Sequence, residues 1–157
     1  MEDLIRNLYF EDIEVGYKTE TPGRTVTEAD VVDFACLTGD FNQLHTDKEF
    51  AEKSIAGQRI AHGLLVWGIA VGLINRTAFA LATQKQMRAM TGCELKFKKP
   101  TLIGDTVHVV MEVMDKIDTR PEADAAKVVF KRTVVNQKGD ELIIGTVSQL
   151  IKKRGNQ

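Results

Sequence analysis

The chain has 157 residues and a mass of 17.5 kDa, and 43% of its residues are hydrophobic and 27% charged, as is usual for a soluble globular protein. Its 21 Lys and Arg residues against 22 Asp and Glu residues give a net charge of −1, which argues against nucleic acid as the main partner because phosphate binding needs a basic excess. We expect a single domain over residues 1–157 that buries a core without a disulfide.

The beginning of the chain, residues 1–15, has mixed character and no apolar run of signal-peptide length. The longest apolar stretch is Leu64–Ile74, which is shorter than the roughly 20 residues that a membrane span needs. We therefore expect a cytoplasmic protein that does not contact a membrane.

The two cysteines, Cys36 and Cys93, lie far apart and form no Cys-x-x-Cys pair. Together with the three histidines (His45, His62 and His108) they give no recognisable zinc-ligand spacing. We expect no metal site, and two buried free thiols in a reducing compartment.

The first elements are a strand and a helix. Residues 18–26 predict a strand interrupted at Pro22-Gly23, after which Thr27 is a candidate helix cap with Asp30 three residues on. The helix stops at Gly39, since glycine is the usual residue just after a helix end. Its predicted inward side chains are Val31, Phe34, Ala35 and Leu37.

Two further helices follow. A short one is predicted over Asp47–Lys53, with Phe50 and Ala51 inward. The run Gly63–Ile74 is apolar on all sides, which is typical of a buried helix. Gly68 and Gly72 lie one turn apart, and their missing side chains would let a sheet approach closely.

The second half of the chain alternates apolar and polar residues between turn signals, which predicts strands. Short turns join the strands, so they pair antiparallel, and a curved sheet wrapped around the buried helix is the simplest α+β arrangement. The expected strands are 95–98, 106–117, 127–136 and 142–152, with turns at 104–105, 119–125 and 136–140.

One stretch concentrates polar chemistry. Asp40, Asn42 and His45 place a carboxylate, an amide and an imidazole within six residues, directly after a helix end. In a bent loop the carboxylate and the imidazole can converge, hold one water and move protons near neutral pH. The ordinary structural explanation is that Asp40 and Asn42 are turn residues and His45 is a hydrogen-bonded structural side chain.

A second stretch lies at the start of the buried helix. The N–H of Gly63 lies where the helix has unpaired donors and partial positive charge, so it could polarise a carbonyl oxygen. The alternative explanation of Gly63 is that it only allows tight packing. His62 can instead cap the helix or form a hydrogen bond inside the core. We expect His108 to be structural. Lys152–Arg154 is expected to be a solvated tail or to contact an anionic ligand. Trp67 and the five methionines are expected in the core or in the lining of a tunnel.

Taken together, these stretches resemble the MaoC-like dehydratase family, also called R-specific enoyl-CoA hydratases or hydratase 2. The resemblance covers nearly the whole chain in order, and Gln43 departs from it, because the family usually has proline there. The matching segments are Tyr9–Gly16, Thr25–Asp30, Leu37–His45, Ala61–Leu64, Phe97–Pro100, Gly104-Asp105 and Asn136-Gln137.

The resemblance implies a hot-dog fold, in which a long helix over about residues 63–81 is wrapped by an antiparallel sheet, and a homodimer or dimer of dimers with a tunnel for an acyl thioester. It implies catalytic roles for Asp40, Asn42 and His45, an oxyanion hole at the Gly63 N–H, and substrate contacts from His62 and Leu64. The substrate it implies is an enoyl thioester of coenzyme A or of acyl carrier protein in fatty acid metabolism, and the reaction is hydration without a cofactor.

Two other functions use the same fold. A hot-dog thioesterase generally carries a lone carboxylate on or near the buried helix, whereas Gly63–Ile74 contains no Asp or Glu. A non-catalytic acyl-thioester-binding protein would not need the set of Asp40, Asn42 and His45. Both remain alternatives to the hydratase.

Overall fold

The structure is a computed structural model that describes residues 7–155. The predicted N-terminal segment is therefore seen from residue 7, and its residues 1–6 lie outside the described residues. From residue 7 to residue 155, no helix is long and apolar enough to cross a membrane.

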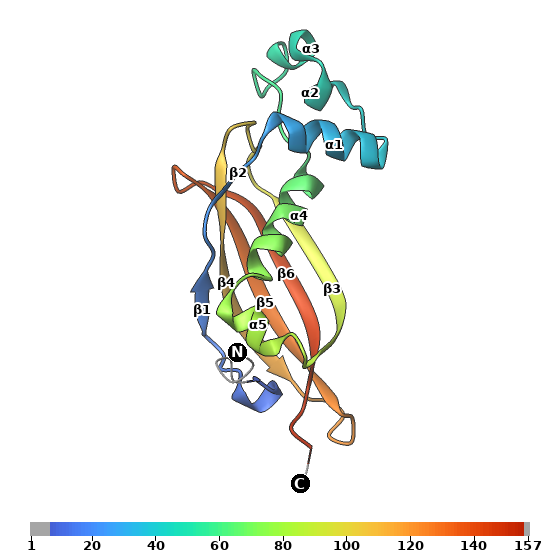
Figure 1. The fold of residues 1–157 in the computed structure, drawn as a ribbon, viewed down its shortest axis with the longest axis vertical. Helices are drawn as coiled ribbons and strands as arrows, with labels where there is room; N and C mark the ends of the chain where they lie inside the picture. The colour runs from blue at the N-terminus through green and yellow to red at the C-terminus, as the bar shows by residue number, and fades with distance from the viewer. Residues whose placement is uncertain (1–6, 156–157) are drawn as a thin grey trace.

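A six-stranded antiparallel sheet forms one side of the molecule (Figure 1). The strand order is β1-β4-β5-β6-β3, and β2 also pairs with β4. The consecutive strands β4, β5 and β6 form the expected meander, and β3 lies at the edge beside β6. The strands are β1 (Lys18–Glu20), β2 (Arg24–Thr25), β3 (Met87–Phe97), β4 (Thr106–Ile117), β5 (Ala125–Asn136) and β6 (Glu141–Lys152).

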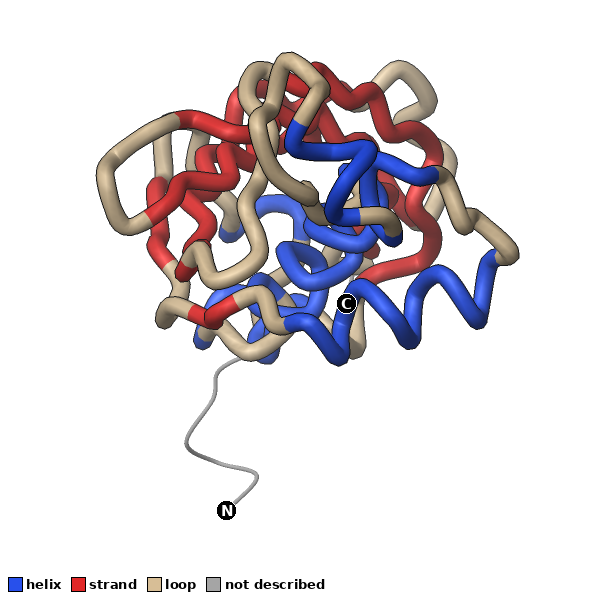
Figure 2. The backbone as a smooth tube through the Cα atoms, turned by 90° about the horizontal axis from the view of Figure 1, so that it is seen from above, coloured by secondary structure: helices blue, strands red, loops and turns tan. Residues whose placement is uncertain are grey.

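The alternation of β4 explains why one face of the sheet is buried. Val107, Val109, Met111 and Val113 point into the core and are almost completely buried, as their spacing of two predicts. Seen from above, the strands curve around the helices (Figure 2), which confirms the expected α+β arrangement. The strand predicted over 95–98 is longer than expected, because β3 begins at Met87.

Five α-helices and one 3₁₀ turn complete the described fold. The cap of α1 is stronger than its sequence suggests: Thr27 accepts from the Asp30 N–H, and the Asp30 carboxylate accepts from the Thr27 N–H. The helices are η2 (Phe10–Asp12), α1 (Glu28–Thr38), α2 (Gln43–Thr46), α3 (Lys48–Glu52), α4 (Gly63–Ile74) and α5 (Ala78–Thr83).

The central helix packs on the sheet through one large side chain. The indole of Trp67 lies so close to Gly145 of β6 that a Cβ at Gly145 would stand 2.1 Å from the ring. The predicted role of Gly68 and Gly72 is wrong, because both face open space within this chain. The long helix also ends at Ile74, and a break separates α4 from α5.

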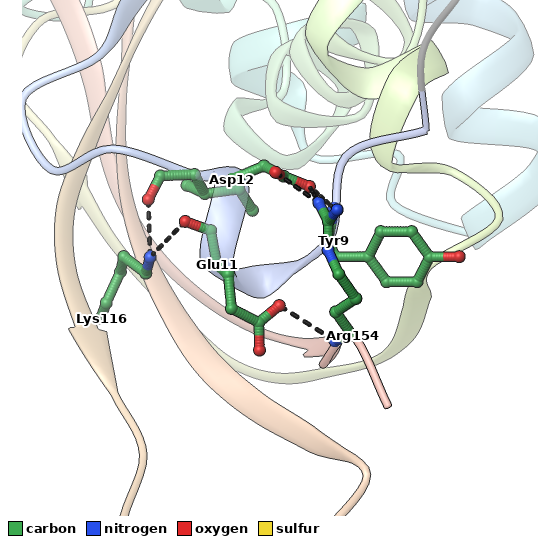
Figure 3. A network of polar contacts seen from close by, with 6 residues as sticks. Tyr9, Glu11, Asp12, Lys116 and Arg154 are labelled. Carbon is green, nitrogen blue, oxygen red and sulfur yellow. Dashed lines mark hydrogen bonds and ion pairs between the residues drawn. The ribbon is translucent and has the colours of Figure 1, made fainter. Parts of the chain in front are cut away.

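The two ends of the described chain are tied together (Figure 3). Arg154 forms an ion pair with the carboxylate of Asp12, and its backbone N–H donates to Glu11. Lys116, near the end of β4, donates to the carbonyl of Ile13. Lys153 pairs with Asp118, so the expected solvated tail at 152–154 is wrong.

Several burial predictions are wrong. Cys36 and Cys93 are both exposed, one on the outer side of α1 and the other on the edge strand β3. Leu37, predicted inward, is 84% exposed. Phe50 is also exposed, whereas Ala51 is buried as expected. Among the methionines, Met87, Met90 and Met114 are exposed and Met111 belongs to the core, while Met1 lies outside the described residues.

Candidate active site

The loop that carries the predicted acid and base follows directly from the end of α1. Gly39 takes a left-handed conformation with φ of 76°, which turns the chain sharply and ends the helix. The short helix α2 then begins at Gln43, an element that the sequence did not predict. Because Gln43 is the first residue of α2, where proline is favoured but not required, its difference from the family pattern leaves the helix start intact.

The structure brings Asp40 and His45 together, and adds His62. One polar atom from each of these three side chains lies within 4.8 Å of the others. Two hydrogen bonds of about 2.8 Å can bridge up to about 5.6 Å, so one water can contact both the Asp40 carboxylate and the His45 imidazole. Asp40 is exposed, His45 half-buried and His62 buried.

A backbone contact determines which nitrogen of His45 is available. Nδ1 of His45 lies 2.8 Å from the carbonyl oxygen of Ile60. A carbonyl oxygen only accepts, so Nδ1 carries the proton and donates it. In neutral His45 the lone pair is then on Nε2, which makes Nε2 the basic atom.

His62 supports this arrangement from inside the protein. Its Nε2 donates to the main-chain carbonyl of Asp40 at 2.9 Å, and its ring lies 3.8 Å from the His45 ring, centroid to centroid. The ring of Phe34 packs against it at 4.9 Å. No side-chain cap of α4 forms at His62, so the core hydrogen bond is the alternative that the structure confirms.

Asn42 has a local structural contact. Its side-chain oxygen accepts from the N–H of Leu44 and caps α2, while its own N–H donates to the carboxylate of Asp40 at 3.3 Å. Asn42 thus links the start of α2 to the Asp40 side chain. Leu44 in turn accepts a hydrogen bond from the Ile60 N–H, which holds the loop against the segment before α4.

Gly63 and His45 line the same pocket, whose volume is about 420 Å³. A side chain at Gly63 would displace the Phe97 ring, since a Cβ would stand 2.4 Å from it. The N–H of Gly63 is the first of α4 and has no acceptor within the helix. Leu64, expected to contact substrate, is 61% exposed and, like Asp40 and His62, does not line this pocket.

The sequence did not identify the opposite wall of the pocket. Phe97, Pro100 and Thr101 form it together with Lys98 and Lys99, all from the end of β3 and the segment after it. The Phe97–Pro100 segment matched the family pattern, but nothing in the sequence fixed its distance from Gly63. These residues add two cations and an aromatic wall to the pocket.

One of these cations is already neutralised. Lys99 forms an ion pair with Asp140, and this hydrogen bond, together with one from Asn136, lowers the pKa of the Asp140 carboxyl below its ordinary value. Within residues 7–155, Lys98 makes no ion pair. The positive charge at the pocket rim is therefore that of Lys98.

The same three side chains that gather at the loop are also a possible metal-binding set. One carboxylate and two imidazoles suit a divalent transition metal. In both His45 and His62 one ring nitrogen already forms a hydrogen bond to a main-chain carbonyl. The nitrogens left to bind a metal are therefore Nε2 of His45 and Nδ1 of His62. Nδ1 of His62 is buried and has no hydrogen-bond partner among the described residues.

The sequence matches the MaoC-like domain family over residues 11–136, which is most of the chain. The chain therefore belongs to the MaoC-like dehydratase family.

Two relatives illustrate the range of that family. The (R)-specific enoyl-CoA hydratase of Rhodospirillum rubrum is 31% identical over 154 residues, which cover 98% of both chains. The protein MaoC of Klebsiella aerogenes is 44% identical over 102 residues, which cover 64% of this chain. This chain spans only 29% of the length of that MaoC protein.

Solved structures agree with the family assignment. A protein of Archaeoglobus fulgidus, named monoamine oxidase regulatory protein, superposes with a TM-score of 0.89 and 39% identity, covering 96% of this chain and 97% of that one. A Mycobacterium tuberculosis protein with a double hot-dog fold superposes with a TM-score of 0.79 over 96% of this chain and 46% of that one, and at 19% identity it shows the fold alone. The fold is thus the expected hot-dog fold.

Proposed function

We propose that this protein hydrates trans-2-enoyl thioesters to R-3-hydroxyacyl thioesters, and catalyses the reverse dehydration. The observation that carries the proposal is the shared pocket: Gly63 and His45 line one cavity, and the Asp40 carboxylate lies within one water of His45. The near full-length similarity to the Rhodospirillum rubrum hydratase supports the same reaction class.

In this mechanism the backbone polarises the substrate. The Gly63 N–H donates to the thioester oxygen, so that the negative charge developing on the enolate oxygen meets a fixed dipole at the start of α4. This withdraws electrons from the double bond and makes the β-carbon electrophilic. At Gly63 the place of a Cβ is taken by the Phe97 ring, which therefore forms the wall of the pocket beside this residue.

Water is activated by the two side chains of the loop. Nε2 of His45 takes one proton from a water held between His45 and Asp40, and the hydroxyl bonds to the β-carbon. Asp40 supplies or relays the proton that the α-carbon receives, so one water is added in total. Asn42 and His62 act as positioning residues, through the Asp40 carboxylate and the Asp40 carbonyl respectively.

In this proposal the group that carries the acyl chain, coenzyme A or the arm of a carrier protein, is anionic. Lys98 brings positive charge to the rim of the pocket, where a phosphate of coenzyme A or of a carrier-protein arm can be bound. Leu64, exposed beside Gly63, is the proposed apolar contact at the entrance.

The decisive experiment is an assay with purified protein and a panel of trans-2-enoyl-CoA substrates, starting with crotonyl-CoA. We expect the absorbance of the conjugated thioester to fall and the R-3-hydroxy product to form, without release of free thiol. Release of thiol instead would establish the thioesterase alternative, and binding without turnover of any substrate would establish the non-catalytic one. Activity should survive dialysis against a chelator, because no step uses a metal.

The assigned residues have their own test. Asp40→Asn and His45→Gln should each lower turnover by about two to four orders of magnitude, the usual range for a positioned acid or base. Asp47→Asn, at the cap of α3 two residues beyond His45, is a matched control that should keep turnover. Near-normal turnover in either of the first two variants would show that this pair does not carry the reaction.

We further propose that two copies assemble through β3. Nearly the whole of this eleven-residue strand is exposed, and it lies at the edge of the sheet, where its outer hydrogen-bonding groups are unpaired. A two-fold pairing of β3 with its copy would join the two sheets, and it is the commonest closed arrangement. Light scattering should give twice the 17.5 kDa chain mass, about 35 kDa.

A matched pair of substitutions tests this assembly. Met90 on β3 and Met114 on β4 are both exposed, at 58% and 46%. Met90→Asp should shift the mass toward that of one chain, whereas Met114→Asp should leave the assembly intact. A protein that is fully active as a single chain would show that a second copy is not needed to build the site.

A further inference from the structure

Arg132 is a buried cation without a counter-charge. It lies on β5, its exposed fraction is 5%, and its Nε has no hydrogen-bond partner. In residues 7–155 no carboxylate comes within ion-pair distance of it. A buried arginine is usually paired, because an isolated charge in the interior costs several kcal/mol.

A cavity of about 190 Å³ lies beside this side chain. Arg132 is the only charged residue among those that line it. Asn75 and Gln149 contribute side-chain amides, while Met111 and Phe130 contribute apolar surface. Two of the residues that line it are exposed, Gln84 just after α5 and Met87 at the start of β3.

This cavity is separate from the candidate active site. It lies at the Ile74 end of α4 near α5, whereas Gly63 begins the opposite end of the helix (Figure 1). The two cavities share no lining residue. Trp67, packed against Gly145, lies on the helix between them.

The surroundings of Arg132 favour a ligand that brings one negative charge. Burial lowers the pKa of the Arg132 guanidinium, and a Coulombic interaction with Cys93 opposes this shift only in part. Arginine nevertheless remains protonated in proteins, so its charge is not removed by losing a proton. The Phe130 ring, 5.8 Å from the guanidinium carbon, compensates only a part of it.

We propose that this cavity is a binding site for a carboxylate with a short apolar tail. The planar guanidinium matches the two oxygens of a carboxylate, the amides of Asn75 and Gln149 supply further donors, and Met111 and Phe130 accept the tail. A single cation suits a monoanion better than a doubly charged phosphate. The carboxylate can belong to a free small acid or to the far end of a larger acyl compound.

Binding to the intact protein tests this with matched probes. Butyrate, acetate and hexanoate are titrated and followed by NMR shifts and by thermal midpoint, with butyramide as the neutral control. We expect saturable binding of at least one carboxylate and none of butyramide at the same concentrations. Equal effects of butyrate and butyramide, or no saturable binding of any acid, would overturn the proposal.

Substitutions locate the site. Arg132→Met should weaken carboxylate binding by about 10- to 100-fold, the value of a hydrogen bond to a charged group, and should not lower the thermal midpoint of the free protein. Lys131→Met, on the neighbouring residue of β5 and the opposite face of the sheet, is the matched control and should leave binding unchanged. Should Arg132→Met fail to fold, Gln149→Leu serves instead, and unchanged binding in it would contradict the proposal.

Two further experiments distinguish a free small acid from a carboxylate at the far end of a larger acyl compound. A free acid should bind equally well with and without a bound enoyl thioester. A carboxylate at the end of an acyl chain should compete with the free acid, and Arg132→Met should then lose tight binding of carboxyl-terminated thioesters but not of their neutral homologues. Because His45→Gln should still bind the carboxylate, failure of this proposal is distinguishable from failure of the proposed hydratase function.

Discussion

Replacing Gly63 by alanine adds a methyl group where the Phe97 ring already lies. The new Cβ would stand 2.4 Å and 2.8 Å from two ring carbons, whereas ordinary contacts begin near 3.4 Å. Phe97 is 55% exposed, so its ring can move toward solvent rather than force the helix away. The substitution therefore displaces one wall of the pocket that Gly63 and Phe97 share.

The expected magnitudes differ for stability and for activity. Overpacking of this kind costs about 1–3 kcal/mol, and alanine in a helix returns up to about 1 kcal/mol relative to glycine. The free energy of unfolding should therefore fall by no more than about 3 kcal/mol. Activity should fall further, because the new methyl group and the displaced Phe97 ring crowd the approach of the thioester oxygen to the Gly63 N–H. Complete loss of that hydrogen bond would lower activity by about 100- to 1000-fold.

Chemical denaturation and kcat/KM measured on the same preparations separate these two effects. Gly72→Ala, on the same helix but facing open space, is the control and should be neutral or stabilising. Adding Phe97→Ala to Gly63→Ala should recover part of the lost stability, because the two substitutions share one contact. If Gly63→Ala keeps turnover within about threefold of the parent protein, the thioester oxygen does not reach the Gly63 N–H past the Phe97 ring.

Two further predictions concern stability alone. Partial burial of Asp30 opposes its ionisation, but hydrogen bonds from Thr27 and Arg24 lower the pKa of its carboxyl below the ordinary value. The ionised carboxylate therefore stabilises the fold above about pH 4, and this stabilisation is lost as the pH falls through the lowered pKa. Asp30→Asn should make the free energy of unfolding less dependent on pH in that range. Gly145→Ala should lower the free energy of unfolding by about 1–3 kcal/mol or more, because the new methyl group would stand 2.1 Å from the ring of Trp67. It should also change the fluorescence of Trp67, the single tryptophan, and an unchanged spectrum and stability would show that the indole does not pack there.

The sequence predicted the sheet well because the burial of these strands is regular. The strand over 106–117 has the predicted bounds, and those over 127–136 and 142–152 differ by one or two residues. The start of β3 was missed, because residues 87–94 lie on an exposed edge and carry no alternation of apolar and polar side chains. An edge strand owes its conformation to its neighbour β6, which is a tertiary effect.

Burial of small and single residues was predicted less well. Cys36 and Cys93 were assigned to the core from the general tendency of cysteine, which says nothing about the face of α1 or the edge of the sheet on which they lie. Gly68 and Gly72 were expected at a close approach, whereas Gly63 and Gly145 are the glycines that the packing requires. A glycine in a sequence shows only that a side chain is missing, not which neighbour approaches.

The two motifs singled out separately in the sequence are parts of one structural unit, and this could not be read from either alone. His62 is 22 residues from Asp40, yet its Nε2–H donates to the Asp40 carbonyl while its ring packs against the His45 ring at an angle of 33°. The Ile60 carbonyl, two residues before His62, fixes the proton of His45 on Nδ1. The segment that leads into α4 therefore positions the loop, the tautomer of its histidine and the Gly63 N–H together. Because one segment sets all three, a shift at residues 60–63 alters base, water and oxyanion donor at once, since contacts from this segment hold both the Asp40 loop and α2 in place.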